Sequence, residues 1–356
     1  MKRYLILSDG SVFEGEAIGA DGDAIGEVVF TTAMVGYMET LTDPSYYGQL
    51  VTQTFPLIGN YGAIEADAES EKPVLGGYIV REECVAGSNF RMESELDAFL
   101  KKYNVVGICG VDTRALTKKI RSKGVMNGII TSKKSLPPEK MKEIKAYRVR
   151  DAVAKTTCAQ ETTLGSGSKR VVLWDFGAKK NIERELLKRD CTVIRVPAHT
   201  SAERIAQLNP DGIMLTNGGG DPADNTAIIE ELKKLNARKI PTFGICLGHQ
   251  LLALSRGATT HKLKFGHRGA NQPVRDTLSG RTYITSQNHG YAVMPASLPA
   301  SATLRYANAN DKTAEGIDYT DIPAFSVQFH PEACGGPLDT NFLFDRFFDL
   351  MNGKAE

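Results

Sequence analysis

The residues with the clearest chemical potential surround Cys246, where an apolar run at 240–245 breaks at Gly244-Ile-Cys246-Leu-Gly248 and a helical pattern follows. Glycines at this spacing let a strand turn sharply into a helix, which exposes the central side chain at the helix N-terminus. The free amides and dipole of that helix favour the thiolate, the reactive form of cysteine. The motif therefore predicts covalent thiol chemistry at Cys246. The alternative is a small buried cysteine beside a glycine-rich turn.

A candidate proton acceptor for this thiol is His330, which follows an apolar run at 323–329 and precedes Pro331 and Glu332. An imidazole can take the thiol proton and later protonate a leaving amine. Glu332 can hold the far ring nitrogen and fix the tautomer, as the acid of a catalytic triad does. We interpret the three residues as nucleophile, base and orienting acid. The alternative for His330 is a structural histidine at a strand end.

A third strand end carries consecutive glycines, in the run Asn-Gly-Gly-Gly-Asp at 217–221. Glycines let the backbone come close to a ligand. The N–H groups of Gly220 and of Leu247, directly after the cysteine, are candidates for an oxyanion hole. A loop that only needs positive φ angles is the alternative. A phosphate-binding loop is disfavoured because the pattern Gly-x-x-x-x-Gly-Lys-Ser/Thr is absent here.

These three signals, in this order, resemble the class I, triad-type glutamine amidotransferases from about residue 170 to the C-terminus. The resemblance implies that Cys246, His330 and Glu332 form a catalytic triad. It also implies attack on the side-chain amide of L-glutamine, which releases ammonia and leaves a γ-glutamyl thioester. Hydrolysis of the thioester then gives glutamate.

The first half of the chain narrows this family. It carries Gly-Glu-Val-Val-Phe-Thr-Thr at 26–32, Gly-Tyr-Met-Glu-Thr-Leu-Thr-Asp-Pro-Ser-Tyr at 36–46, Gly-Asn-Tyr-Gly at 59–62 and Val-Asp-Thr-Arg-Ala-Leu-Thr at 111–117. These runs look like the small subunit of carbamoyl-phosphate synthetase, so the resemblance covers nearly the whole chain. By resemblance, the glutamine-binding residues are Ser45, Gly218, Gly220, Leu247, Gln250, Asn288, Gly290 and Tyr291.

The resemblance also implies a partner, a large synthetase subunit that binds ATP and magnesium, receives ammonia through a tunnel and makes carbamoyl phosphate from bicarbonate. That product serves pyrimidine and arginine synthesis. No cofactor or metal is expected in this chain itself. His249, His261, His267 and His289 lack metal-ligand spacing and are predicted to be structural.

Three places depart from the family pattern without removing a catalytic group. Gly219 stands where proline is usual, so the oxyanion loop is predicted to be less preorganised. Tyr291 replaces a phenylalanine. Cys334 lies in Ala-Cys-Gly at 333–335, where Ala-Ser-Pro is common.

Composition is that of an ordinary globular protein. Lys+Arg of 43 against Asp+Glu of 42 gives a formal charge of +1, which argues against a nucleic-acid partner. The six cysteines contain no C-x-x-C pair, so reduced thiols and a cytoplasmic location are expected. The first apolar run is too short for a signal peptide, and no stretch approaches a membrane span.

The pattern of elements predicts an α/β protein of two domains. Residues 1–153 alternate short β-rich runs with turns and show helical spacing at 94–103 and 113–122, which predicts a β-rich α/β domain. The polar stretch 154–169 reads as a linker. From 170 to 356 a βαβ rhythm predicts a doubly wound, mostly parallel sheet of the class I glutamine amidotransferase type, with the three chemical signals at its carboxyl edge.

Two other functions remain open at this point. A free-standing γ-glutamyl hydrolase or cysteine peptidase could use the same elbow, although the Asp-Pro-Ser-Tyr half of the chain argues against it. A non-catalytic scaffold that regulates a synthetase is the second. Rapid, stoichiometric alkylation of Cys246 by a glutamine-like electrophile would count against the scaffold.

Overall fold

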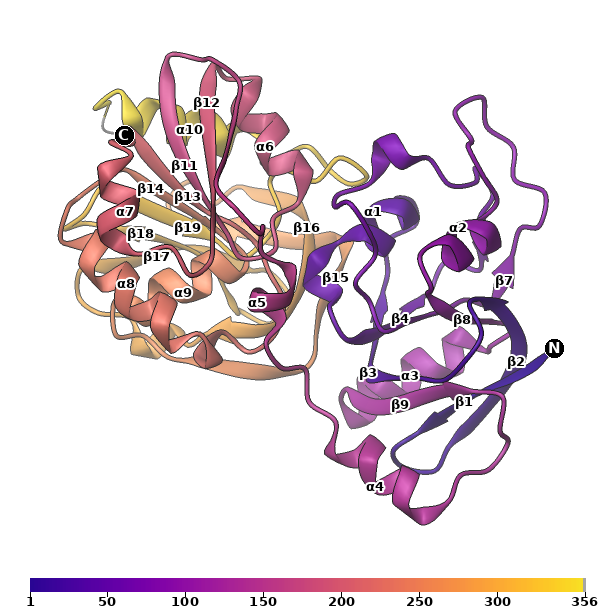
Figure 1. The fold of residues 1–356 in the computed structure, drawn as a ribbon. Coiled ribbons are helices and arrows are strands. Elements are labelled where there is room, and N and C mark those ends of the chain that lie inside the picture. Colours follow the sequence, from indigo (N-terminus) through magenta and orange to yellow (C-terminus); the bar gives the residue numbers. More distant parts are fainter. Residues whose placement is uncertain (355–356) are drawn as a thin grey trace. The chain divides into compact units, whose positions relative to one another are not determined.

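The structure of the chain, a computed structural model, describes residues 1–354 and divides into two compact units between Arg150 and Asp151. Figure 1 shows the N-terminal unit from indigo to magenta and the C-terminal unit from magenta to yellow. In the described part of the chain, no helix is both long and apolar enough to cross a membrane.

The N-terminal unit is built on a closed barrel with the strand order β1-β2-β8-β6-β4-β3-β9. Strands β3, β4, β6 and β8 pair in parallel, and the other neighbours pair antiparallel. Its strands are β1 (Lys2–Leu7), β2 (Val12–Gly19), β3 (Ala24–Thr31), β4 (Gln49–Gln53), β5 (Leu57–Ile58), β6 (Gly77–Ile79), β7 (Glu82–Glu83), β8 (Val106–Cys109) and β9 (Met126–Thr131). Its helices are α1 (Tyr37–Thr42), η1 (Pro44–Tyr46), η2 (Glu65–Asp67), α2 (Leu96–Lys102), α3 (Thr113–Lys123) and α4 (Pro138–Ala146).

Helix α3 shows how local sequence sets an element of this unit. The carboxylate of Asp112 accepts a hydrogen bond from the N–H of Ala115 at 2.9 Å and caps the first turn. Gly124 ends the helix with φ 98°, a conformation that glycine adopts at little cost. The helices predicted at 94–103 and 113–122 are therefore confirmed as α2 and α3.

The C-terminal unit contains one ten-stranded sheet with the order β10-β12-β11-β13-β14-β19-β18-β17-β15-β16. Its strands are β10 (Thr162–Leu164), β11 (Lys169–Asp175), β12 (Cys191–Pro197), β13 (Gly212–Leu215), β14 (Thr242–Ile245), β15 (Thr260–Asp276), β16 (Thr282–Val293), β17 (Ala302–Asn308), β18 (Ala314–Tyr319) and β19 (Ala324–Val327). Its helices are α5 (Ala152–Thr156), α6 (Lys180–Leu187), α7 (Ala202–Gln207), η3 (Pro222–Asp224), α8 (Thr226–Asn236), α9 (Leu247–Ser255), η4 (Pro295–Ser297) and α10 (Phe342–Met351).

Helices cover both faces of this sheet, as alternate residues of β11 demonstrate. Val171 and Leu173 pack in one core with side chains of α6 and α10. Val172 and Trp174 pack in the other core, with side chains of α7, α8 and α9. Because successive side chains of a strand point to opposite faces, a fully apolar strand requires cover on both sides. The predicted α/β fold is confirmed.

The sheet has a parallel half and an antiparallel half. Strands β12, β11, β13, β14 and β19 run parallel to one another. Strands β18, β17, β15 and β16 are joined antiparallel. The chain passes from β15 to β16 and from β17 to β18 through short turns, and only antiparallel strands can be joined so directly. The antiparallel extension goes beyond the mostly parallel sheet that the βαβ rhythm predicts.

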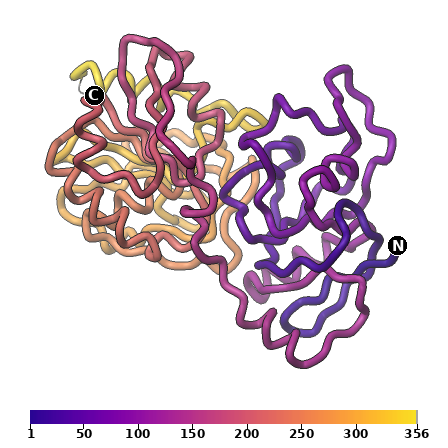
Figure 2. The backbone as a smooth tube through the Cα atoms, viewed as in Figure 1, coloured from indigo at the N-terminus to yellow at the C-terminus, as the bar shows by residue number. Residues whose placement is uncertain are grey.

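The segment 154–169, predicted as a linker, belongs to the C-terminal unit. It includes β10, which pairs with the neighbouring strand β12 through Thr163 and Ile194. The hydroxyl of Thr157 donates to the carbonyl of Asp175 at 2.6 Å, and the N–H of Cys158 donates to its carboxylate at 2.8 Å. Figure 2 follows the backbone through this stretch. The segment is held by hydrogen bonds of its backbone and its polar side chains. An analysis of hydrophobic periodicity therefore does not detect this strand.

Candidate active site

Cys246 lies at the turn between β14 and α9, where its backbone has φ 53° and ψ −103°. Positive φ is costly for a residue with a Cβ, on the order of 1–3 kcal/mol, and such strain is concentrated at functional sites. The strand ends at Ile245 and the helix begins at Leu247, which places the thiol at the helix N-terminus. This is the elbow geometry that the Gly-x-Cys-x-Gly spacing predicts.

Both flanking glycines are required by close backbone packing. A Cβ at Gly244 would lie 2.9 Å from the carbonyl carbon of Gly248, and one at Gly248 would lie 2.3 Å from the carbonyl oxygen of Leu215. Both contacts are with backbone, which cannot move aside as a flexible side chain can. The helix therefore starts directly against β13 and β14, and only glycine fits.

His330 and Glu332 form a buried pair just beyond β19, the strand that pairs in parallel with β14. Nδ1 of His330 lies 2.6 Å from Oε1 of Glu332, and both side chains are fully buried. The backbone N–H of His330 donates to the carbonyl of Ser286 at 2.9 Å, which ties this turn to β16. With Nδ1 engaged, Nε2 is the ring nitrogen left to exchange a proton with Cys246.

The charges around this pair set its protonation. Burial and the ammonium of Lys179 lower the pKa of His330, but Glu332 and Cys246 outweigh both and raise that pKa to about 9. Burial raises the pKa of Glu332, whereas His330 and Lys179 bring it below its usual range. The resting pair at neutral pH is an imidazolium held by a carboxylate.

Lys179 is a residue of this site that the sequence analysis missed. Its Nζ lies 3.2 Å from Nδ1 of His330 and 3.4 Å from Oε1 of Glu332. Its backbone N–H donates to Oδ1 of Asn217 at 3.0 Å. The side-chain amide of Asn181 also donates to the carbonyl of Glu332. The run Phe-Gly-Ala-Lys-Lys-Asn at 176–181 follows β11, so the strand-end rule that found the other motifs applies to it as well.

The glycine loop lies against the elbow. A Cβ at Gly218 would meet the carbonyl oxygen of Phe176 at 2.4 Å and Cδ2 of Leu247 at 2.7 Å, so the loop packs directly on the residue after the nucleophile. Gly220 has φ 90°, which requires glycine. As the first residue of α9, Leu247 has an amide with no acceptor within its own helix. The structure thus packs the glycine loop against Leu247 through Gly218, and the oxyanion roles of Gly220 and Leu247 stay predictions.

Strand β16 brings several of the predicted glutamine-binding residues to the elbow. The thiol of Cys246 lies 3.7 Å from the carbonyl oxygen of Asn288. The side-chain amide of Gln250 donates to the carbonyl of Tyr291 and to Oε1 of Gln328, both at 2.8 Å. Gly290 lies between Asn288 and Tyr291 in β16 and is half-buried.

Two further residues were singled out by the sequence. Ser45 lies in η1 of the N-terminal unit, where its N–H donates to the carboxylate of Asp43 at 2.9 Å, so its contact with glutamine stays a prediction. Cys334, one of the departures from the family pattern, is exposed.

Comparison with known proteins decides the family. Residues 5–130 match the family model described as carbamoyl-phosphate synthase small chain, CPSase domain, and residues 172–350 match the one described as glutamine amidotransferase class-I. The chain is 52% identical to the carbamoyl phosphate synthase small chain of Oceanobacillus iheyensis, over 99% of this chain and 97% of that protein. The chain belongs to this family.

Other members of the carbamoyl phosphate synthase small chain family are equally similar. The protein of that name from Fusobacterium nucleatum is 51% identical, with 99% of both chains covered. Among solved structures, a glutamine amidotransferase from Thermotoga maritima matches 53% of this chain and 86% of its own length, with 18% identity and a TM-score of 0.39. The resemblance to carbamoyl-phosphate synthetase small subunits that the sequence indicated is confirmed.

Proposed function

We propose that this chain hydrolyses L-glutamine at Cys246 and passes ammonia to a large carbamoyl-phosphate synthetase subunit. The observation that carries the proposal is the placement of a strained cysteine at a helix N-terminus next to a fully buried His330–Glu332 pair. The two motifs follow neighbouring parallel strands, β14 and β19. Membership of the small chain family supports the identity of the acceptor.

In the first half of the reaction, the thiolate of Cys246 attacks the side-chain amide carbon of glutamine. The carbonyl oxygen becomes an oxyanion, and the N–H groups of Leu247 and Gly220 stabilise it. Collapse breaks the C–N bond while the His330 imidazolium gives its proton to the departing nitrogen. The products are ammonia and a γ-glutamyl thioester on Cys246.

In the second half, water attacks the thioester carbonyl and neutral His330 takes its proton. The C–S bond breaks, glutamate leaves, and the thiolate and imidazolium are restored. Glu332 keeps Nδ1 protonated throughout, so that Nε2 is always the nitrogen that exchanges the proton. The sum is glutamine plus water giving glutamate plus ammonia.

The remaining predicted site residues would hold the substrate. Asn288 and Tyr291 lie in the segment of β16 that contacts the elbow. This position supports a role for both residues in binding the glutamine substrate. Gly218 and Gly290 would let the main chain approach the ligand, and Gln250 would fix the carbonyl of Tyr291. For Ser45, a role in binding glutamine is inferred from the family resemblance alone.

The partner follows from the chemistry of the product. Ammonia is largely protonated in neutral water and then no longer nucleophilic, so an enzyme that uses it needs a protected path to a second site. The proposed large subunit would hold ATP, magnesium and bicarbonate there. All six cysteines of this chain are free, which supports work in a reducing, cytoplasmic compartment.

The test is carbamoyl phosphate formation by the purified chain mixed with a large subunit, ATP, magnesium and bicarbonate. We expect glutamine to drive synthesis only when this chain is present, and ammonium chloride to drive it without the chain. Glutamine hydrolysis without nitrogen transfer would refute the proposed partner but keep the amidase. Absence of both, with an inert Cys246, would favour the scaffold.

A further inference from the structure

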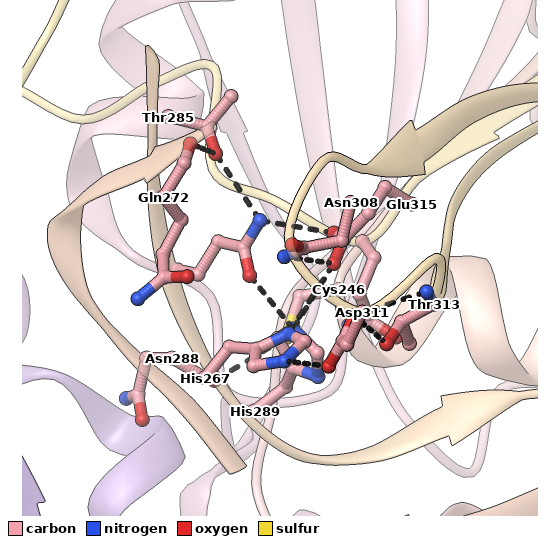
Figure 3. A network of polar contacts seen from close by, with 12 residues as sticks. Cys246, His267, Gln272, Thr285, Asn288, His289, Asn308, Asp311, Thr313 and Glu315 are labelled. Carbon is pink, nitrogen blue, oxygen red and sulfur yellow. Dashed lines mark hydrogen bonds and ion pairs between the residues drawn. The ribbon is translucent and has the colours of Figure 1, made fainter. Parts of the chain in front are cut away.

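A second buried cluster of titratable side chains lies in the antiparallel half of the C-terminal sheet. His267 comes from β15, His289 from β16 and Glu315 from β18. One ligand atom of each lies within 4.8 Å of the other two, and all three residues are buried. Figure 3 shows these side chains pointing toward one another. The catalytic reaction proposed above uses none of them.

Hydrogen bonds fix which nitrogen of His289 carries its proton. Nδ1 lies 2.8 Å from the carbonyl oxygen of Tyr291, so it must donate. In a neutral ring, Nε2 is then an acceptor. It faces Oε1 of Gln287 at 3.1 Å and Oε1 of Glu315 at 4.0 Å. Neither of those oxygens can donate unless Glu315 is protonated.

The amide of Gln287 cannot turn to repair this contact. Its nitrogen donates to Oε2 of Glu315 at 3.0 Å and to the hydroxyl oxygen of Thr285 at 3.2 Å. The hydroxyl of Thr285 donates its proton to the carbonyl of Gln272 at 2.8 Å, so the hydroxyl oxygen must accept from Gln287. The oxygen of Gln287 is therefore the atom that faces His289.

His267 adds another acceptor. Its Nε2 lies 2.8 Å from the carboxylate of Asp311 and therefore donates. Its Nδ1 lies 3.3 Å from Oε1 of Glu315, which also accepts from the amide of Asn308 at 3.3 Å. When both rings are neutral, lone pairs of two imidazole nitrogens, a carboxylate oxygen and an amide oxygen converge in a buried space. Such a set is unfavourable unless something positive lies between its members.

We propose that His267 Nδ1, His289 Nε2, Glu315 Oε1 and Gln287 Oε1 form a structural site for one divalent transition metal ion, with zinc the best match. Imidazole nitrogen and carboxylate oxygen are usual zinc ligands, and zinc favours four of them. Bonds of about 2.0–2.2 Å in a tetrahedron place ligand atoms roughly 3.3–3.6 Å apart. The spacings of 3.3 and 4.0 Å to Glu315 are close to this range, and the widest spacing, up to 4.8 Å among the three ligand atoms, must shorten on binding.

The outer contacts are those that a metal-bound histidine makes. Asp311 accepts from the far nitrogen of His267, and the carbonyl of Tyr291 accepts from the far nitrogen of His289. Such partners fix the tautomer and increase the basicity of the ligating nitrogen. The second oxygen of Glu315 is held by Gln287. Each ligand ring is thus already oriented.

Extra protons are the rival explanation, and each accounts for only part of the cluster. A proton on Oε1 of Glu315 would not reach His289, because the oxygen lies 4.0 Å from Nε2. A proton on His267 would satisfy its contacts with Asp311 and Glu315. It would leave His289 and Gln287 facing each other as two acceptors. A further proton on His289 would place a second buried positive charge beside the first, since the two ring centroids are 4.9 Å apart. A single metal ion satisfies both contacts.

The site would brace the strand segment at the elbow without taking part in catalysis. The carbonyl of Tyr291 receives hydrogen bonds from both His289 and Gln250. Asn288, next to His289, presents its carbonyl to Cys246. A metal that links β15, β16 and β18 would hold this segment in place. The inference does not depend on the proposed reaction.

The experiment is zinc binding by the metal-stripped full chain, measured with zinc alone against a competing chelator. Cobalt absorption would report whether the ligands include a thiolate. The cluster variants are Glu315→Gln and His289→Gln, and the matched controls are His199→Gln, an exposed histidine, and Cys246→Ser. We expect one equivalent in the wild type and in both controls, without thiolate ligation, and at least tenfold weaker binding in the cluster variants.

Binding of less than one equivalent by the wild type, thiolate ligation, or equal affinity in the cluster variants would overturn the site. If a cluster variant fails to fold, Asp311→Asn replaces it, since the Asp311 side chain is half exposed. Loss of an outer partner typically weakens metal affinity about 10- to 100-fold. Zinc should raise the melting temperature of the wild type and raise it less in Asp311→Asn. An equal rise in both would count against the site.

Discussion

Two buried histidine–glutamate clusters occupy the two halves of the C-terminal sheet, and they differ in what faces the imidazole. In the parallel half, Glu332 holds one nitrogen of His330 and the other is left for the thiol of Cys246. In the antiparallel half, Asp311 and the carbonyl of Tyr291 hold the outer nitrogens of two histidines. Their inner nitrogens face oxygen acceptors. The same side chains thus favour proton transfer in one place and cation binding in the other.

Removing the nucleophile should sharpen this contrast most. Cys246→Ser should reduce glutamine-driven carbamoyl phosphate synthesis by at least about 10⁴-fold, because a serine hydroxyl is not ionised by this pair. Ammonia-driven synthesis by the complex should be unchanged, and zinc binding should persist. The measurements are the rate of carbamoyl phosphate synthesis with glutamine and the rate with ammonia. Loss of both rates would contradict the separation of the two reactions.

Neutralising the acid of each cluster gives the second largest effect. Glu332→Gln should lower kcat/KM for glutamine on the order of 10²–10⁴-fold, because the imidazolium loses its counter-charge. The same change should lower the pKa of His330 from about 9, so the alkaline limit of activity moves to lower pH. Glu315→Gln should change kcat by less than about tenfold and leave that limit in place. Equal pH shifts in both variants would break the comparison. A pH profile of kcat/KM tests this.

The backbone of the elbow should tolerate the replacement of glycine by alanine less well than the backbone of β16 does. Gly248→Ala should lower the free energy of unfolding by at least about 2 kcal/mol, because its Cβ would lie 2.3 Å from a backbone oxygen. Gly290→Ala should cost less than about 1 kcal/mol, since its Cβ would meet only the end of the Arg268 side chain at 3.1 Å. Denaturant unfolding of both variants gives the difference. Similar losses would show that the elbow is not specially constrained.

The smallest effect is expected at Lys179. Its charge lowers the pKa of His330, so Lys179→Met should raise that pKa and extend glutamine hydrolysis to higher pH. Activity at neutral pH should change by less than about tenfold, because His330 is already protonated there. The control is Lys180→Met, the next residue in the chain. A shift of the alkaline limit to lower pH in Lys179→Met would contradict the assigned electrostatics.

The catalytic cluster could be predicted because its parts are short motifs at strand ends. The cysteine with its flanking glycines and the His-x-Glu run each lie within a few residues, and parallel strands bring their carboxyl ends together. Lys179 was missed because a lysine in a polar run, here next to Lys180, is usually an exposed surface residue. Its role depends on a distance that spacing does not encode.

The metal cluster could not be predicted for a different reason. Its members come from β15, β16 and β18, and the antiparallel pairing that joins them was not visible in the βαβ rhythm. Their separation along the chain follows no metal motif. The strand in the segment 154–169 was also not predicted, because β10 pairs with β12 through backbone groups that composition does not reveal.

The positive φ of Cys246 affects which substitutions at this position would stabilise the chain. Glycine at this position would relieve backbone strain on the order of 1–3 kcal/mol, so the cysteine is retained against thermodynamic preference. A duplicated gene copy released from glutamine hydrolysis should therefore drift toward glycine there and encode a more heat-resistant protein. At this turn, the thiol therefore comes at a cost in backbone stability.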